Sequence, residues 1–218
     1  EQTPLYAQGY FVYDSKKSGS MTTSHLRFGP RPIHAPYLIR KADFVACSQF
    51  AFVGQTDVLG FARVGATVPL NSPHSLAETW RKLPLDWQRT LLAKKLRVFV
   101  IDATQVSQTA GMGRRTNTVL QTCFFALSGV LPREEAIYQI KATIKKTYGK
   151  KGESIVAMTY AAVDAALAGL HELTPISPEL AAAVDATPLV PLPPRFVGAP
   201  DFVQRITARL LAGEGDLL

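Results

Sequence analysis

The sequence is poor in residues that bind metals. It has two cysteines, Cys47 and Cys123, in unrelated contexts, and no CxxC pair that would hold an iron–sulfur cluster. Cys47 ends an apolar strand-like segment and Cys123 lies in an apolar helical one, so we expect two buried free thiols. The four histidines form no HxH or HxxxH pair. The sequence therefore supports no metal site within this chain.

Long apolar segments are also missing. No apolar run approaches the roughly 20 residues that a membrane-spanning helix requires. Residues 1–4 have neither the basic segment nor the apolar core of a signal peptide. We therefore expect a cytoplasmic protein without a membrane partner. With 218 residues, 47% of them hydrophobic, the chain is long enough for one large domain or one domain plus a tail.

Acidic residues are in the minority. The chain has 24 Lys and Arg against 17 Asp and Glu, a net charge of +7, and such a balance favours anionic partners. The positive residues cluster in four segments: 16–17, 94–97, 114–115 and 141–151. Solvated helix faces would explain much of this clustering. No helix-turn-helix, finger or aromatic–basic pattern accompanies it, so we expect no nucleic-acid partner and keep such binding as a remote alternative.

The first three-quarters of the sequence alternate strand-like and helix-like patterns, which is typical of an α/β domain. The apolar segments that indicate strands are 10–13, 43–47, 67–70 and 96–101. Pro69 indicates an edge strand or a strand end, because proline cannot donate to a β-ladder.

Helix signals are clearer. Ser75, with Glu78 three residues later, predicts a capping box and a helix from Leu76. Apolar residues at helical spacing predict further helices at 117–128, 132–148 and 154–173.

The character of the sequence changes after Thr174. Seven prolines follow without a lasting period, which predicts an extended connector. We expect an α/β domain at residues 1–174 and a Pro-rich connector at 175–218, with a short terminal helix at 201–211.

A series of ordered motifs resembles one enzyme family. Residues 14–29, DSKKSGSMTTSHLRFG, are similar to the signature D-S-K-K-S/A-G-G-x-T-x-S-H-L-R-F-G of the pyruvate:ferredoxin/flavodoxin oxidoreductases. The likeness continues through 42–47, 70–73, 113–117, 148–153 and 161–164. It covers most of residues 5–172, and it implies the central, gamma-type α/β domain of these enzymes (domain III), of the pyruvate synthase and nitrogen-fixation type.

The resemblance implies a function for the parent enzyme. Pyruvate would be decarboxylated on thiamine diphosphate with Mg2+, electrons would pass through 4Fe-4S iron–sulfur clusters to ferredoxin or flavodoxin, and coenzyme A would take the acetyl group. The thiamine and the clusters belong to other domains, and we expect the parent to be a homodimer. The domain matched here would receive coenzyme A and pack against its neighbours. We expect it to carry no catalytic residue of its own.

The family's coenzyme A contacts fall on a few positions of this sequence. They are Lys17 or Lys16, Asn117 and Thr159. Thr159 stands where the family has asparagine, so a single hydroxyl replaces an amide that has separate donor and acceptor groups. Ser20 replaces the second glycine of the signature, which restricts a turn that needs positive φ.

These residues also have a physical interpretation. The phosphates of coenzyme A require cations and N–H donors, which Lys16 and Lys17 would supply from a loop at the carboxyl end of a strand. Arg114 and Arg115 precede a helix start, where an anion is favoured, although structural capping is equally consistent. His25 and Arg27 are expected to face a carboxylate or phosphate in a neighbouring active site, or to serve an ordinary ion-pair or interface role.

Two main hypotheses follow. The chain is either the coenzyme A-binding domain of a pyruvate oxidoreductase or a non-catalytic scaffold module of the same enzyme that bridges neighbouring domains.

Overall fold

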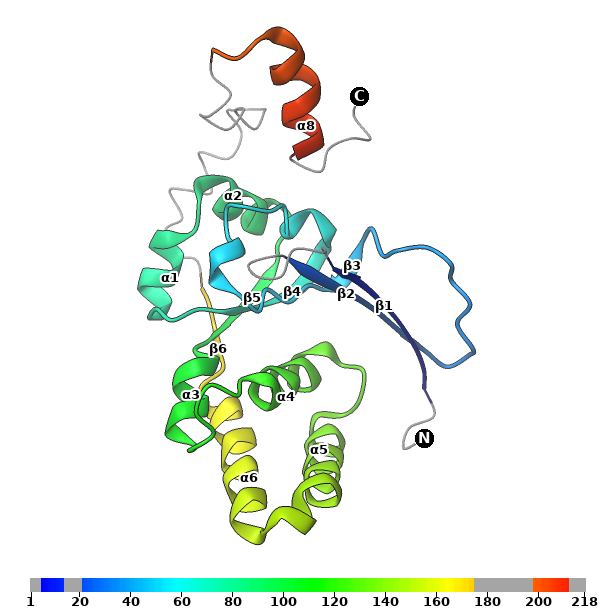
Figure 1. The fold of residues 1–218 in the computed structure, drawn as a ribbon, viewed down its shortest axis with the longest axis vertical. Coiled ribbons are helices and arrows are strands. Elements are labelled where there is room, and N and C mark those ends of the chain that lie inside the picture. The colour runs from blue at the N-terminus through cyan, green and yellow to red at the C-terminus, as the bar shows by residue number, and fades with distance from the viewer. Residues whose placement is uncertain (1–4, 14–20, 175–197, 212–218) are drawn as a thin grey trace. The chain divides into compact units, whose positions relative to one another are not determined.

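The computed structural model describes residues 5–13, 21–174 and 198–211 (Figure 1). The chain divides into two units, Glu1–Ile176 and Ser177–Leu218. The first unit is a mixed α/β domain, which confirms the predicted fold class. Residues 175–197, where most of the predicted connector falls, lie outside the described residues, so the boundary at residue 174 stays a prediction.

A four-stranded sheet forms the centre of the first unit. Its order is β3 (Ala42–Phe44), β4 (Ala62–Asn71), β5 (Arg97–Ile101) and β6 (His171–Glu172). The first three strands are parallel and β6 pairs antiparallel with β5. The predicted strand at 96–101 is confirmed with nearly its expected bounds, because its valines, Phe99 and Ile101 are all buried.

Pro69 lies inside β4, a central strand, so the prediction of an edge or a strand end is wrong. The backbone of alternate β4 residues faces β3. On that side the Val45 N–H donates to the Thr67 carbonyl and the Cys47 N–H donates to the Pro69 carbonyl. Pro69 can accept but cannot donate. The missing donor thus falls on the side of β3, the shorter of the two strands next to β4, and β5 keeps an unbroken ladder on the other side.

A separate antiparallel hairpin precedes the sheet. It consists of β1 (Tyr6–Tyr13) and β2 (Thr22–Gly29), paired over their full lengths. The predicted strand at 10–13 is confirmed within β1. An isolated two-stranded ribbon is only marginally stable, and this one is held at its base, where the ring of Phe28 lies 5.9 Å from that of Phe124.

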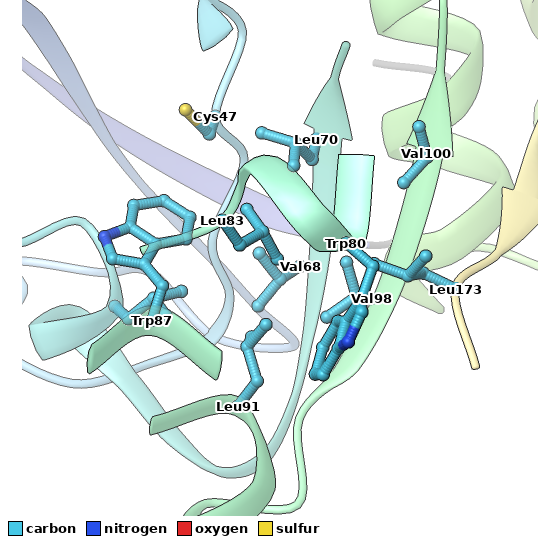
Figure 2. Packing of buried hydrophobic residues seen from close by; sticks show 11 residues of the cluster. Cys47, Val68, Leu70, Trp80, Leu83, Trp87, Leu91, Val98, Val100 and Leu173 are labelled. Atoms are coloured by element: carbon cyan, nitrogen blue, oxygen red, sulfur yellow. The ribbon is translucent and has the colours of Figure 1, made fainter. Parts of the chain in front are cut away.

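Two short helices cover one face of the sheet. α1 (Leu76–Lys82) begins with the predicted capping box at Ser75, and α2 (Leu85–Ala93) follows it. The two helices and Leu83 between them bury two tryptophans and two leucines against alternate residues of β4 and β5 (Figure 2). The buried members of this cluster are Cys47, Leu59, Val68, Leu70, Trp80, Leu83, Trp87, Leu91, Val98, Val100 and Leu173.

Four helices lie on the other side of the sheet (Figure 1). They are α3 (Ala103–Thr109), α4 (Asn117–Ser128), α5 (Arg133–Tyr148) and α6 (Glu153–Ala168). Short 3-10 turns occur at Phe50–Phe52, Leu59–Phe61 and Gly149–Lys151. The buried residues that join α3, α4 and α6 to β5 are Ile101, Ala103, Val119, Cys123, Ala162 and Ala166. The predictions of helices at 117–128 and 132–148 are confirmed.

The helix predicted at 154–173 ends earlier than expected. α6 stops at Ala168, and residues 171–172 form strand β6 instead. The Leu173 N–H donates to the Val98 carbonyl at 2.8 Å, and the Leu173 side chain is buried against the sheet. Pairing with β5 therefore outweighs the local helical pattern, because it covers an otherwise open strand edge.

The described part of the second unit is helical. A π-helical turn at Val203–Thr207 leads into α8 (Ala208–Leu211). Across the described ranges, no helix has both the length and the apolar character needed to cross a membrane.

Candidate functional site

Lys16 and Lys17 fall in the segment 14–20, which connects β1 to β2 and lies outside the described residues. Their predicted place at the carboxyl end of a strand needs correction in one respect. The strand before them belongs to the antiparallel hairpin and not to the parallel sheet. The general rule for ligands at the carboxyl edge of open α/β sheets does not apply to them.

A glycine-rich basic loop joins α3 to α4. Gly111 and Gly113 have φ values of 78° and 62°, in the left-handed region that favours glycine. Internal hydrogen bonds fix the loop: the Met112 N–H donates to the Ser107 carbonyl at 2.8 Å, and the Ser107 hydroxyl donates to the Arg115 carbonyl at 3.1 Å. The path of the chain into α4 is therefore set by buried Ser107 and by two glycines.

The start of α4 leaves polar groups free. Thr116 is the N-cap residue, but its side chain makes no capping hydrogen bond. Asn117 is the first helical residue, it is exposed, and its side chain has no hydrogen-bond partner in the described part of the chain. The Asn117 amide therefore does not cap α4. We call residues 110–117 the loop-to-helix junction.

Positive charge at this junction is uncompensated. Arg114 and Arg115 are exposed, and within the described ranges neither forms an ion pair. The N–H groups in the first turn of an α-helix have no carbonyl partner within the helix and carry partial positive charge. Two guanidinium groups, these N–H groups and the free amide of Asn117 together make a site that suits an anion.

Thr159 lies on α6 beside this region. Its neighbour Met158 lies against Gly111, where a Cβ on the glycine would come within 3.6 Å of the methionine side chain. Thr159 itself is buried, and its hydroxyl donates to the Ile155 carbonyl at 2.7 Å. Its hydrogen-bonding proton is thus used inside the helix, and the role carried over from the family stays a prediction.

His25 and Arg27 hold a loop of the chain itself. The Ile39 N–H donates to Nδ1 of His25 at 3.2 Å, so the imidazole carries its proton on Nε2. Arg27 donates to the Tyr37 carbonyl at 2.6 Å, and its guanidinium carbon lies 4.8 Å from the centroid of the Tyr37 ring. Burial, and then the charge of Arg27, lowers the pKa of His25. The expected orientation of these two residues toward a neighbouring active site stays a prediction.

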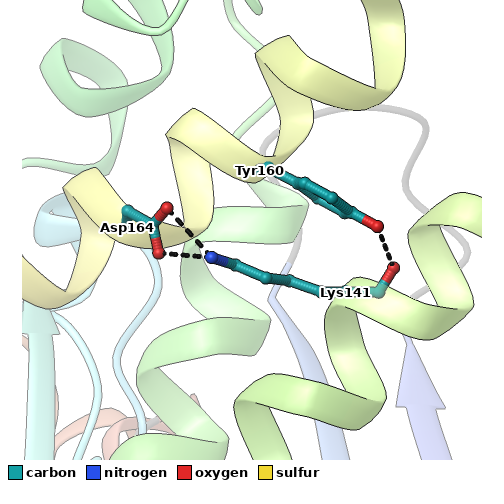
Figure 3. A network of polar contacts seen from close by, with 3 residues as sticks. All are labelled: Lys141, Tyr160 and Asp164. Carbon is teal, nitrogen blue, oxygen red and sulfur yellow. Dashed lines mark hydrogen bonds and ion pairs between the residues drawn. The ribbon is translucent and has the colours of Figure 1, made fainter. Parts of the chain in front are cut away.

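Part of the basic segment 141–151 has a structural role that the sequence did not reveal. Lys141 on α5 donates to both carboxylate oxygens of Asp164 on α6, at 2.7 and 3.0 Å, and the Tyr160 hydroxyl donates to the Lys141 carbonyl at 3.0 Å (Figure 3). Lys94 is used similarly, since its ammonium group donates to the Leu59 and Ala62 carbonyls. Partners far apart in sequence leave no local signal, so such pairs could not have been found from the chain alone.

The two cysteines are free and buried, as predicted. Burial raises the pKa of Cys123 to about 12 and also raises the pKa of Cys47, so neither is a thiolate at neutral pH. No cluster of three or more His, Cys, Asp or Glu side chains that could hold a metal occurs among the residues that the structure describes.

A cleft of about 440 Å³ lies between the base of the hairpin and helices α4 and α5. Its lining contains no charged side chain; hydroxyl and amide groups alternate with apolar ones. It is thus chemically distinct from the cationic loop-to-helix junction.

The fold occurs in a subunit of a pyruvate oxidoreductase. The crystal structure of the pyruvate oxidoreductase subunit PORC from Thermotoga maritima matches with a TM-score of 0.57, over 76% of this chain and 80% of that chain, at 13% identity. This likeness establishes the architecture and agrees with the expected gamma-type α/β domain.

Sequence comparison places the chain in a family. The family model for pyruvate ferredoxin/flavodoxin oxidoreductase matches residues 2–169. The pyruvate-flavodoxin oxidoreductase of Rhodospirillum rubrum is 53% identical over 98% of this chain, and the pyruvate:ferredoxin oxidoreductase of Moorella thermoacetica is 45% identical over 100% of this chain. The chain belongs to the pyruvate ferredoxin/flavodoxin oxidoreductase family. It spans 17–18% of the length of these two relatives.

Proposed function

We propose that this chain is the coenzyme A-binding module of a pyruvate:ferredoxin/flavodoxin oxidoreductase. The complete enzyme would convert pyruvate and coenzyme A to acetyl-CoA and CO2 and pass electrons to ferredoxin or flavodoxin. Family membership supports this proposal, as do relatives of both names that align with nearly the whole chain. Thiamine diphosphate, Mg2+ and iron–sulfur clusters would be held by other parts of the polypeptide.

The observation that carries the coenzyme A assignment is the loop-to-helix junction. Coenzyme A bears a 3′-phosphate and a pyrophosphate, which need cations and N–H donors. Arg114 and Arg115 are exposed without ion-pair partners in the described ranges, and Asn117 offers a free amide at the start of α4. Other cations of the basic segments, such as Lys141 and Lys94, already hold parts of the fold.

The chain's own residues would bind and orient coenzyme A without reacting with it. Lys16 and Lys17 would add charge from the β1–β2 connection, as the resemblance implies. Thr159 contributes least to the proposal, because it is buried and bonded within α6. Thiamine diphosphate supplies the carbanion chemistry of decarboxylation when it is bound elsewhere in the enzyme. The role of this module is thus to bind coenzyme A so that its thiol can take part in that reaction.

Asn117→Asp in the full-length oxidoreductase tests the proposal. Aspartate at the first turn suits the helix dipole, so stability should be unchanged or slightly higher. The exchange removes the N–H donor and places a negative charge beside phosphates. We expect the KM for coenzyme A to rise about tenfold to a hundredfold, while the KM for pyruvate stays the same.

A matched control is Gln108→Glu, the same amide-to-acid exchange on an exposed residue of α3 just before the junction. It should change the KM for coenzyme A far less. If Asn117→Asp and Arg114→Ala both leave this KM at the wild-type value, the alternative function as a scaffold module is correct instead.

A further inference from the structure

One face of the β1–β2 hairpin is apolar and has few contacts with the chain. Residues directly opposite each other in an antiparallel pair point to the same side. The pairs Ala7/Phe28, Gly9/Leu26, Phe11/Ser24 and Tyr13/Thr22 therefore share a face. A Cβ on Gly9 would lie 3.2 Å from Leu26 and 3.6 Å from Phe11, which confirms that these three residues are neighbours. We call this set of eight residues the hairpin stripe.

Exposure along the stripe increases away from the domain. Phe28, whose ring lies near that of Phe124, is 37% exposed, and Leu26 is 43% exposed. Phe11 and Tyr13, toward the other end of the hairpin, are 63% and 73% exposed. Large apolar side chains that gather on one exposed surface mark an interaction site, whereas single ones do not.

The opposite face of the hairpin is different at its base. His25 and Arg27 on that face bind the backbone of Ile39 and Tyr37. The loop 37–39 thus already occupies part of that side, whereas the stripe meets the domain mainly at Phe28. Tyr10 and Val12 on that opposite face are 38% and 44% exposed, less than Phe11 and Tyr13, so the stripe is the more exposed face away from the domain.

The stripe continues into the cleft of about 440 Å³ at the base of the hairpin. Ala7 and Phe28 belong to both, and Phe125 and Ile140 extend the apolar surface onto α4 and α5. Neither the stripe nor the cleft lining contains a charged side chain, although the chain has a net charge of +7. Such a surface offers nothing to a phosphate backbone or an anionic lipid headgroup, and it fits an apolar protein surface.

We propose that the hairpin stripe docks on an apolar surface of the remainder of the oxidoreductase polypeptide, outside these 218 residues. The length of the relatives supports this occupant, because nearly the whole chain aligns with 17–18% of them. More than four-fifths of such a polypeptide is therefore available to cover the stripe. The inference rests on the proposed function only in taking the oxidoreductase as the parent protein, and it does not depend on coenzyme A binding.

Photocrosslinking in the full-length oxidoreductase tests the docking. Benzoylphenylalanine replaces Phe11 in one variant and Tyr138 in the control; Tyr138 is an aromatic residue of α5 with a similar exposure of 69%. After irradiation, crosslinked peptides are identified by mass spectrometry. We expect Phe11 to link to peptides from outside the 218 residues, and Tyr138 to give no link to those same peptides.

Three results would overturn the proposal: links from Phe11 only to a second copy of this module, links only to added phospholipid vesicles, or a yield at Phe11 no higher than at Tyr138. The readout is independent of the coenzyme A site. Crosslinking can succeed while Asn117→Asp leaves the KM for coenzyme A unchanged, so failure of this inference and failure of the proposed function are distinguishable.

Discussion

Asn117 and Thr159 come from adjoining helices, yet their polar groups are in opposite situations. The Asn117 amide is exposed and free of partners in the described part of the chain, whereas the Thr159 hydroxyl is buried and donates to Ile155. The resemblance to the family implies a coenzyme A contact at both positions. In the structure, a ligand could reach the Asn117 amide without rearrangement. The Thr159 hydroxyl could contact a ligand only while it also donates to the Ile155 carbonyl within the helix.

His25 predicts a pH dependence of stability. Burial lowers its pKa below the ordinary value of 6.5, so the unfolded chain binds more protons between the folded and unfolded pKa values. The contribution of neutral His25 is therefore complete above about pH 6.5 and is lost as the pH falls below it. His25→Gln keeps an acceptor for the Ile39 N–H but does not titrate. We expect unfolding midpoints of wild type and variant to converge as the pH falls from about 7.5 to about 5.5.

Urea unfolding of the two proteins at several pH values measures this effect. Parallel curves, with a constant difference over the whole range, would show that the His25 imidazole does not couple to folding.

At the scale of elements, the contact between α5 and α6 gives a structural account of one family motif. Asp164 belongs to the matched segment 161–164, and here it pairs with Lys141 across the two helices. The Lys141 ammonium also lies 5.6 Å from the centroid of the Tyr160 ring, and the Tyr160 hydroxyl bonds to the Lys141 backbone. A structural clamp alone is sufficient to explain the aspartate.

We expect Asp164→Asn to lower the free energy of unfolding by about 0.2–1 kcal/mol, because the pair is partly exposed to solvent. The KM for coenzyme A should not change. Asp43→Asn is the matched control, since it breaks a more exposed pair with Arg63 between β3 and β4, and it should cost no more. A higher KM for coenzyme A with unchanged stability would assign Asp164 to the binding site instead.

Local signals predicted some elements well and others poorly, for physical reasons. The capping box at Ser75 and the apolar spacing of α4 act within one helix, so the sequence alone reveals them. β6 exists because β5 offers an edge, and the helical pattern at 154–173 does not contain that information. Pro69 is tolerated in a central strand because its neighbour on one side, β3, is short. Strand β2 went unrecognised, because its run TTSHLRFG lacks a clear apolar alternation.

The candidate site shows the same limit. The sequence indicates the positive charge of residues 114–115 and the amide of Asn117, but their freedom from partners depends on the tertiary structure. The pairings of Lys94 and Lys141 depend on it equally. A cluster of basic residues in the sequence therefore combines cations that hold the fold with cations that are available to a ligand.

At the scale of the whole molecule, the cations behind the net charge of +7 divide into those that pair within the fold and those that do not. Arg63, Arg97 and Lys141 pair with carboxylates, Lys94 binds carbonyls, and Arg114 and Arg115 remain at the loop-to-helix junction. Free charge also occurs near the end of α5, where Lys145, Lys146 and Lys150 are exposed and, in the described ranges, form no ion pair. The group at the loop-to-helix junction lies at a helix N-terminus and suits a phosphorylated ligand, and no nucleic-acid-binding motif accompanies either group in the sequence.

The isolated 218-residue chain should show no pyruvate-dependent reduction of a viologen dye. It has no closely spaced cysteines to ligate a cluster and no sequence motif for thiamine diphosphate and magnesium. The measurement is anaerobic absorbance with pyruvate and coenzyme A present, and the full-length oxidoreductase is the positive control. Calorimetry on the same two samples should show weaker binding of coenzyme A to the isolated chain, because the parent polypeptide would supply further contacts. Dye reduction by the pure, cluster-free chain would refute its assignment as one module of a larger enzyme.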